Sequence, residues 1–117
     1  MAFRFQKFRV YQDAKVFHRK IVFLTKNFPS EFWYLKDQLR RASLSIILQI
    51  AEGSAKSSDK DFNRYLGIAL GSGNETAAGL DVAFGEDLIS QQDFLDALKM
   101  NETLVNQLGS FSKKLKA

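Results

Sequence analysis

Few side chains in this sequence have the chemistry of a catalytic or metal site. His18 is the single histidine and no cysteine is present, which excludes thiolate sites and histidine pairs for zinc. Glu52 and Glu75 are the candidates for a general base, yet neither has a second acidic group at a fixed spacing, a nucleophile or a set of metal ligands. We therefore expect no catalytic residue, no metal, no cofactor and no enzymatic activity.

Glycines recur within residues 67–85, but they do not make a phosphate-binding loop. Their spacing lacks the lysine and hydroxyl ending of a P-loop, and no predicted strand precedes them. Each glycine costs about 1 kcal/mol relative to alanine inside a helix. We expect the side of the helix that carries Gly67 and Gly71 to accept the close approach of a neighbouring helix, and helix bending is the alternative.

Basic charge is concentrated in the first third of the chain. Residues 1–41 hold ten lysines and arginines against three acidic residues, whereas residues 42–117 hold seven against ten. Such a region is a candidate surface for nucleic acid, and ordinary solvated helix faces are the alternative. The candidate nucleic-acid-binding residues are Arg4, Lys7, Arg9, Arg19, Lys20, Lys36 and Arg40.

Apolar residues spaced by three and four positions predict an all-α domain that covers residues 1–117. The first helix should end before Pro29, and Gly53 is a natural cap for the second. The four predicted helices span about residues 6–27, 35–53, 59–88 and 91–115. Charges interrupt the segment MAFRFQKFRV before an apolar run develops, so we expect neither a signal peptide nor a membrane span, and a cytoplasmic protein.

Polar residues on the second and third predicted helices should meet across the hairpin between them. If the two helices are antiparallel and symmetric about residues 56 and 57, Gln38 lies near Glu75 and Arg41 lies near Ser72. We expect these four residues to form a structural polar cluster in which Arg41 donates to the Glu75 carboxylate. Removing one partner of such a pair would leave the other without compensation.

The second predicted helix is apolar on two sides, which a helix at the surface of a small bundle does not need. The side facing away from the predicted core carries Leu44, Ile47, Leu48 and Ala51. We expect this side to contact other copies of the chain. A partial alternative is that Phe3, Phe5 and Phe8 fold back over it within one chain.

Four segments resemble, in order and spacing, the bacterial family of 23S rRNA intervening-sequence proteins. They are FRVYQDA (8–14), NFPSE (27–31), QLRRASLSIILQIAEG (38–53) and IALGSGNE (68–75). The resemblance covers about residues 5–90, and the last predicted helix matches only by its apolar pattern. Two positions depart from the family pattern, with Ile47 where proline is usual and Gln49 where asparagine is usual.

The resemblance implies an antiparallel up-down-up-down four-helix bundle that assembles with itself into a ring, typically a pentamer, without established enzymatic activity. A more distant relative, the accessory protein of diversity-generating retroelements, is a basic pentameric barrel associated with nucleic acid and a reverse transcriptase. The expected partners are therefore other copies of this chain and RNA or a nucleic-acid enzyme, with no membrane. A protein-binding adaptor without a nucleic-acid role is the alternative function.

Overall fold

The computed structural model describes residues 3–116, which form four long helices and no strand. The long helices are α1 (Arg9–Thr25), α2 (Trp33–Ser54), α3 (Asp59–Gly85) and α4 (Gln91–Lys116). Two short 3-10 helices, η1 (Arg4–Lys7) and η2 (Ser30–Phe32), precede α1 and α2. The prediction of an all-α fold is confirmed.

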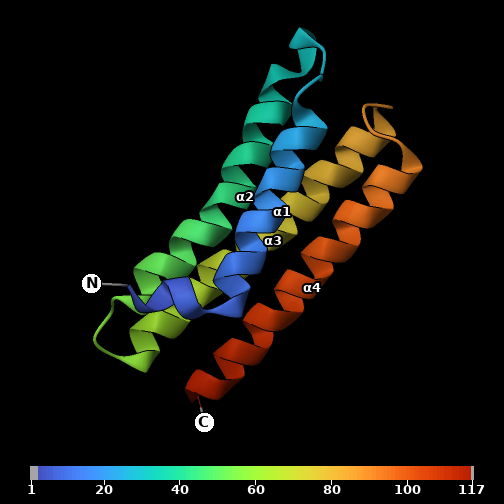
Figure 1. The fold of residues 1–117 in the computed structure, drawn as a ribbon. Coiled ribbons are helices and arrows are strands. Elements are labelled where there is room, and N and C mark those ends of the chain that lie inside the picture. Colours follow the sequence, from blue (N-terminus) through green and yellow to red (C-terminus); the bar gives the residue numbers. More distant parts are fainter. Residues whose placement is uncertain (1–2, 117) are drawn as a thin grey trace.

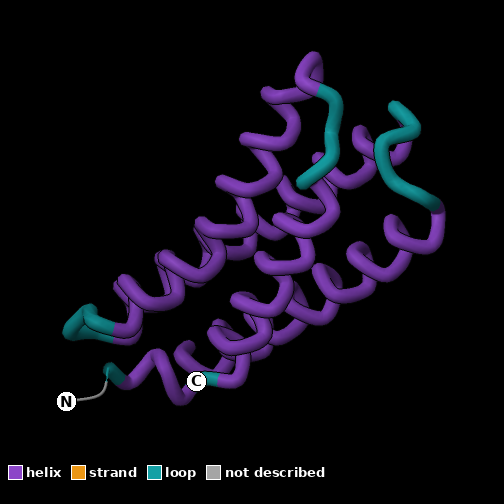
Figure 2. Tube along the Cα trace, turned by 45° about the horizontal axis from the view of Figure 1, so that its top comes forward, coloured by secondary structure: helices purple, strands orange, loops and turns teal. Residues whose placement is uncertain are grey.

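Neighbouring helices run in opposite directions along the bundle (Figures 1 and 2). In each pair of neighbouring helices, a residue late in one helix contacts a residue early in the other, as antiparallel packing requires. Side-chain hydrogen bonds join Thr25 to Arg40, Gln38 to Glu75, Ser112 to Asn63 and Gln107 to Asp13. These contacts describe an up-down-up-down bundle in which α4 returns to lie beside α1.

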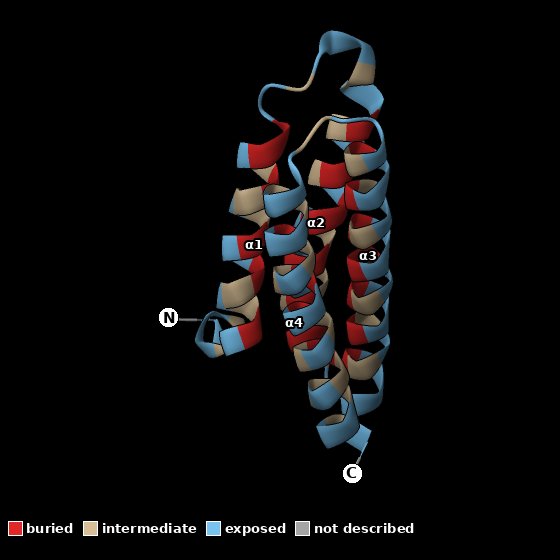
Figure 3. Ribbon diagram, turned by 90° about the vertical axis from the view of Figure 1, so that its right-hand side faces the viewer, coloured by how far each residue is buried: buried red, intermediate tan, exposed pale blue. Residues whose placement is uncertain are grey.

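One contiguous core fills the space between the four helices. The inward residues of each helix are buried and the outward residues are exposed (Figure 3). This pattern follows from the spacing of three and four residues seen in the sequence, because side chains at those intervals share one helix face. The largest fully buried apolar side chains are Phe17, Ile21, Leu39, Ile46, Ile50, Phe62, Leu66, Leu80, Leu104 and Leu108.

The first predicted helix is divided in the structure. Phe8 has an extended backbone, with φ −75° and ψ 127°, and separates η1 from α1. Its ring packs 5.2 Å from Phe111 and 6.2 Å from Phe62. Burial of Phe8 against α3 and α4 therefore outweighs continuation of the helix, and the predicted start at residue 6 is wrong.

The other helix boundaries lie within three residues of the predictions, and α3 and α4 begin at the predicted residues. Asp87 has a φ of 60° and reverses the chain after α3, and the Leu88 amide donates to the Ala83 carbonyl at 2.9 Å. This is a helix cap of the Schellman type, which usually places glycine in the left-handed position. Because aspartate rather than glycine occupies this position, the cap was not recognised from the sequence. The apolar pattern predicted a helix to residue 88, whereas α3 ends at Gly85.

None of the helices in the described part of the chain combines the length and the hydropathy needed to cross a membrane.

Candidate nucleic-acid interface

Two of the seven candidate cations make contacts between different elements of the bundle. The Arg4 side chain donates from Nε to the Ser54 carbonyl at 2.8 Å and lies over the Phe62 ring. The Arg40 side chain donates to the Thr25 hydroxyl at 2.9 Å and to the Val22 carbonyl at 3.1 Å. These guanidinium groups join α2 to the chain segments beside it, so their first role is structural.

The remaining candidates do not gather into one patch. Lys7 and Arg9 lie at the start of α1 and are exposed, whereas Lys36 lies early in α2, next to the opposite end of α1. Arg19 and Lys20 lie between the two ends, the first exposed and the second half-buried. The structure therefore spreads the basic N-terminal third along the length of the bundle.

A groove between the start of α1 and the second half of α4 gathers cations that the sequence does not place together. Its volume is about 650 Å³. Lys7 and Arg9 line one side, and Lys114 lines the other. The remaining lining residues are Phe8, Val10, Thr103, Asn106, Gln107, Ser110 and Phe111.

Sequence reasoning missed Lys114 because it assigned residues 42–117 an acidic balance. The last turn of α4 nevertheless carries Lys113, Lys114 and Lys116, a local cluster of one sign. Since α4 packs antiparallel to α1, that turn must come close to the basic start of α1. The run of lysines at the end of α4 was the signal that could have identified the groove.

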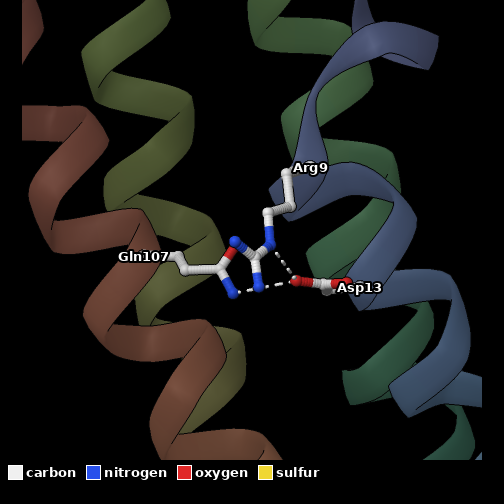
Figure 4. Close-up of polar contacts among 3 residues, drawn as sticks. All are labelled: Arg9, Asp13 and Gln107. Atoms are coloured by element: carbon white, nitrogen blue, oxygen red, sulfur yellow. Dashed lines mark hydrogen bonds and ion pairs between the residues drawn. The ribbon is translucent and has the colours of Figure 1, made fainter.

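A polar bridge joins α1 to α4 beside the groove. Gln107 donates from Nε2 to the Asp13 carboxylate at 3.0 Å, and Arg9 Nε lies 3.5 Å from the same oxygen (Figure 4). Asp13 is the acidic residue at this point and it faces both partners. Asp13 therefore holds α4 against α1 and orients the Arg9 side chain. Lys7 and Lys114 line the groove walls.

The polar cluster predicted between α2 and α3 forms only in part. Gln38 donates to the Glu75 carboxylate at 2.6 Å, as the symmetric hairpin predicted. Arg41 does not contact Glu75 and pairs with Asp37 at 3.7 Å, because at four residues' separation on the same helix Asp37 is closer. Ser72 donates to Ser45 at 2.9 Å. The predicted Arg41–Glu75 pair is wrong.

The outer side of α2 also differs from its prediction. Leu44 and Leu48 are 40% and 53% exposed and Ala51 is half-buried, but Ile47 is only 7% exposed and belongs to the core of its own chain. The placement of Ile47 on this side is wrong, because Ile47 shares a helix face with Arg40 and Ser43, whose side chains contact α1. We call Leu44, Leu48 and Ala51 the outer α2 face.

The N-terminal phenylalanines cover the outer α2 face only partly. Phe8 turns into the bundle, whereas Phe3 and Phe5 stack on each other with ring centroids 5.5 Å apart. Phe3 stays 63% exposed and borders a hollow of about 680 Å³ that Leu48 and Ala51 also line. The partial alternative of cover within one chain therefore holds for Phe3 and Phe5, which border this hollow, and not for Phe8.

The glycines that permit close helix packing are not the predicted ones. A Cβ at Gly67 or Gly71 would meet no atom within 4 Å, so no helix of this chain approaches there. A Cβ at Gly53 would lie 2.7 Å from the Tyr65 Cβ, and one at Gly79 would lie 2.6 Å from the Leu39 side chain. Close approach between α2 and α3 thus depends on Gly53 and Gly79.

His18 lies between α1 and α2, with its Nδ1 2.7 Å from the Ser43 hydroxyl. Burial lowers the pKa of His18 below its ordinary value of 6.5, and the Arg40 guanidinium lowers it further. The unfolded chain therefore binds a proton more readily than the folded one. The resulting stability is present above pH 6.5 and is lost as the pH falls toward the lowered pKa.

We expect the melting temperature of the protein to fall between pH 8 and pH 5, and His18→Gln to remove part of that fall because it removes the titrating group. Thermal unfolding followed by circular dichroism at both pH values measures the difference. An equal acid-induced loss in the two proteins would contradict this role of His18.

The described residues hold no group of three or more histidine, aspartate or glutamate side chains able to bind a metal. Glu52 and Glu75 are both exposed and lie on different helices, and Glu75 accepts from Gln38. A general base needs a reacting partner held within hydrogen-bond reach. Among the described residues, no hydroxyl or amine side chain donates a hydrogen bond to either carboxylate.

Comparison with known proteins agrees with the resemblance seen in the sequence. A crystal structure of a protein of unknown function from Bacteroides thetaiotaomicron, described as belonging to the S23 ribosomal protein family, has a TM-score of 0.79 and 25% identity; the match covers 89% of this chain and 98% of that one. No curated protein matches the sequence. The model of the 23S rRNA-intervening sequence protein family matches residues 6–110, and neither description names an enzyme. The chain belongs to the 23S rRNA-intervening sequence protein family.

Proposed function

We propose that this protein is a non-enzymatic scaffold that assembles with itself and binds structured RNA through the groove between α1 and α4. The observation that carries the proposal is the gathering of Lys7, Arg9 and Lys114 around one groove. Cations from two chain segments about a hundred residues apart in sequence meet there, which gives phosphate groups a defined place to bind.

The side chains that line the groove suit RNA better than they suit a partner that offers only acidic groups. Besides the cations, Asn106 and Gln107 supply amides, and Thr103 and Ser110 supply hydroxyl groups. Such side chains can hydrogen-bond to phosphate, sugar and base edges. The family description, which names an intervening sequence of 23S rRNA, is consistent with this partner.

The surface of a single chain supports self-assembly. Leu44 and Leu48 expose apolar surface on α2, and Gly67, Gly71 and the 43%-exposed Ile68 leave a shallow apolar strip on α3. A protruding apolar face and a flat face on the same chain suit a head-to-tail contact, which closes into a ring when the rotation allows. From the family resemblance, we propose a pentamer.

Binding of RNA should depend steeply on salt. We expect a structured RNA to bind at low salt, with the logarithm of affinity falling linearly with the logarithm of salt concentration as phosphate contacts release counterions. Filter binding of the wild-type protein across a salt series measures this slope. Absence of binding at low salt would contradict the proposed function.

A pair of double variants locates the contact. Lys7→Ala with Lys114→Ala should weaken binding and reduce the salt slope by about 1 for each phosphate that the protein no longer neutralises. The matched control is Lys26→Ala with Lys99→Ala, which removes two exposed cations that do not line the groove. Equal weakening by both pairs would show that the charge acts through the whole surface rather than through the groove.

A second candidate function, a protein-binding adaptor, is favoured by exposed aromatic side chains outside the groove. Phe23, Trp33 and Tyr34 are 70%, 67% and 54% exposed, and aromatic residues are enriched in protein interfaces. A partner that remains bound after nuclease treatment, and is released by Trp33→Ser, would support the adaptor. Release of the partner by nuclease would support RNA.

A further inference from the structure

We propose that the groove between α1 and α4 receives an unpaired nucleotide of the RNA rather than the backbone of a duplex. This inference rests on the proposed RNA binding and specifies which feature of the RNA the site takes. It follows from the shape of the groove and from the kinds of side chain that line it.

The groove is an open hollow on the surface of the bundle, along which a base turned out of a loop or bulge can lie. Its volume of about 650 Å³ lies within the usual range of small-molecule pockets, about 300–1,000 Å³. A-form duplex RNA is recognised mainly by shape and by backbone contacts across a shallow minor groove. A base within a duplex cannot enter a pocket of this kind, whereas a base in a loop or bulge can turn out into it.

Apolar and aromatic residues provide a surface for such a base. Phe8 and Phe111 line the groove, are half-buried, and meet edge to face with centroids 5.2 Å apart. Val10 extends the apolar lining along α1. Unstacked bases are commonly held against aromatic side chains, and because every base has a flat π face this contact tolerates different sequences.

The polar residues surround this apolar lining in the arrangement that a nucleotide requires. Lys7 and Arg9 on the α1 side and Lys114 on α4 supply cations for the flanking phosphates. Asn106 and Gln107 carry amide groups that both donate and accept, which suits the edge of an exposed base. Gln107 is also positioned by its hydrogen bond to Asp13 at 3.0 Å, so its place on the groove wall is fixed.

The main alternative occupant is an acidic amphipathic helix of a protein. Such a helix would use the same cations, but it presents carboxylates and alkyl side chains, and these make no particular use of the amides and hydroxyl groups at Thr103, Asn106, Gln107 and Ser110. The number of polar uncharged residues on the α4 side therefore favours a nucleotide.

The test compares two RNAs with equal numbers of phosphates, one a blunt duplex and the other a hairpin with an unpaired loop. We expect the wild-type protein to bind the hairpin about tenfold more tightly, since only the hairpin adds stacking and base-edge contacts. Equal affinity for the two RNAs would overturn the inference while leaving the proposed RNA binding intact. Absence of binding to either RNA would overturn both.

A substitution in the groove separates base recognition from phosphate binding. Asn106→Ala should reduce the preference for the hairpin over the duplex, because it removes an amide available to the unpaired base and removes no charge. Asn74→Ala is the matched control, since Asn74 is an exposed asparagine on α3 outside this groove. A preference that Asn106→Ala does not change, or that Asn74→Ala lowers equally, would overturn the inference.

Photo-crosslinking shows directly which segments of the protein contact the unpaired nucleotide. A hairpin with 4-thiouridine in its loop should crosslink to peptides that contain residues 7–10 or 103–114, the two segments that line the groove. Crosslinks confined to other segments would overturn the inference. Capture of an acidic helical peptide in this groove, without any RNA binding, would assign the groove to a protein partner and overturn it as well.

Discussion

Replacing Leu48 with aspartate is expected to separate the assembly into single folded chains. Leu48 is 53% exposed in one chain, so its replacement changes the stability of that chain by only about 0.5 kcal/mol. In an assembly whose contacts bury the outer α2 face, the same aspartate would place a charge in an apolar interface. Gel filtration with light scattering measures the mass, and circular dichroism checks that the helices remain.

The substitution Ile47→Asp, at the adjacent residue, should destabilise the single chain itself rather than the contacts between chains. Ile47 is 7% exposed and belongs to the core, so truncating it alone would cost about 2–5 kcal/mol. Desolvating the new carboxylate adds to that cost. Because a small domain has only about 5–15 kcal/mol of stability, we expect unfolding of the helices rather than dissociation of folded chains.

Leu95→Asp is the matched control for the Leu48 substitution. Leu95 is also a leucine on a helix surface and is 51% exposed, but it lies on α4 rather than on the outer α2 face. This variant should keep the mass of the wild-type protein. Dissociation by Leu95→Asp, or an unchanged mass for Leu48→Asp, would contradict the assignment of the outer α2 face.

The second large effect concerns two glycines that differ in their surroundings. Gly53→Ala should lower the free energy of unfolding by about 1–3 kcal/mol, because the new methyl group would lie 2.7 Å from the Tyr65 Cβ and 2.9 Å from the Phe62 ring. The Tyr65 Cβ is held by the backbone of α3 and cannot rotate away. The two helices must therefore move apart.

Gly67→Ala should instead raise the free energy of unfolding of the single chain by up to about 1 kcal/mol. Gly67 lies inside α3 with no neighbouring atom within 4 Å of an added Cβ, so only the gain in helix propensity remains. Chemical denaturation of both variants, in a Leu48→Asp background that removes assembly, measures the two effects. Changes of the same sign would show that backbone flexibility, and not packing, sets the role of these glycines.

Much of the fold follows directly from the sequence because a helix repeats every 3.6 residues. Inward positions such as Phe17 and Leu66 recur at intervals of three and four, and both side chains are fully buried. Helix ends depend instead on single contacts. The break at Phe8 comes from packing against Phe62 and Phe111, and the end of α3 comes from Asp87 in a left-handed conformation.

The candidate site was less predictable because it depends on contacts between distant segments. The groove needs Lys114, which is far from Lys7 and Arg9 in the sequence and close to them only after α4 returns to α1. Arg41 shows the same limit, since the spacing of four residues allows Asp37 as its partner, the symmetry of the hairpin allows Glu75, and only the fold selects Asp37. The sequence also did not predict that Ile47 faces the core, because this depends on where the N-terminal part of the chain packs against α2.

Self-assembly is the claim on which the proposed scaffold depends most. The mass of the wild-type protein in solution tests it most directly, by light scattering coupled to gel filtration over a dilution series at micromolar concentrations. We predict a particle of several subunits, each of 13.3 kDa, with five as the number that the family resemblance implies. A single species of 13.3 kDa at every concentration would contradict the account.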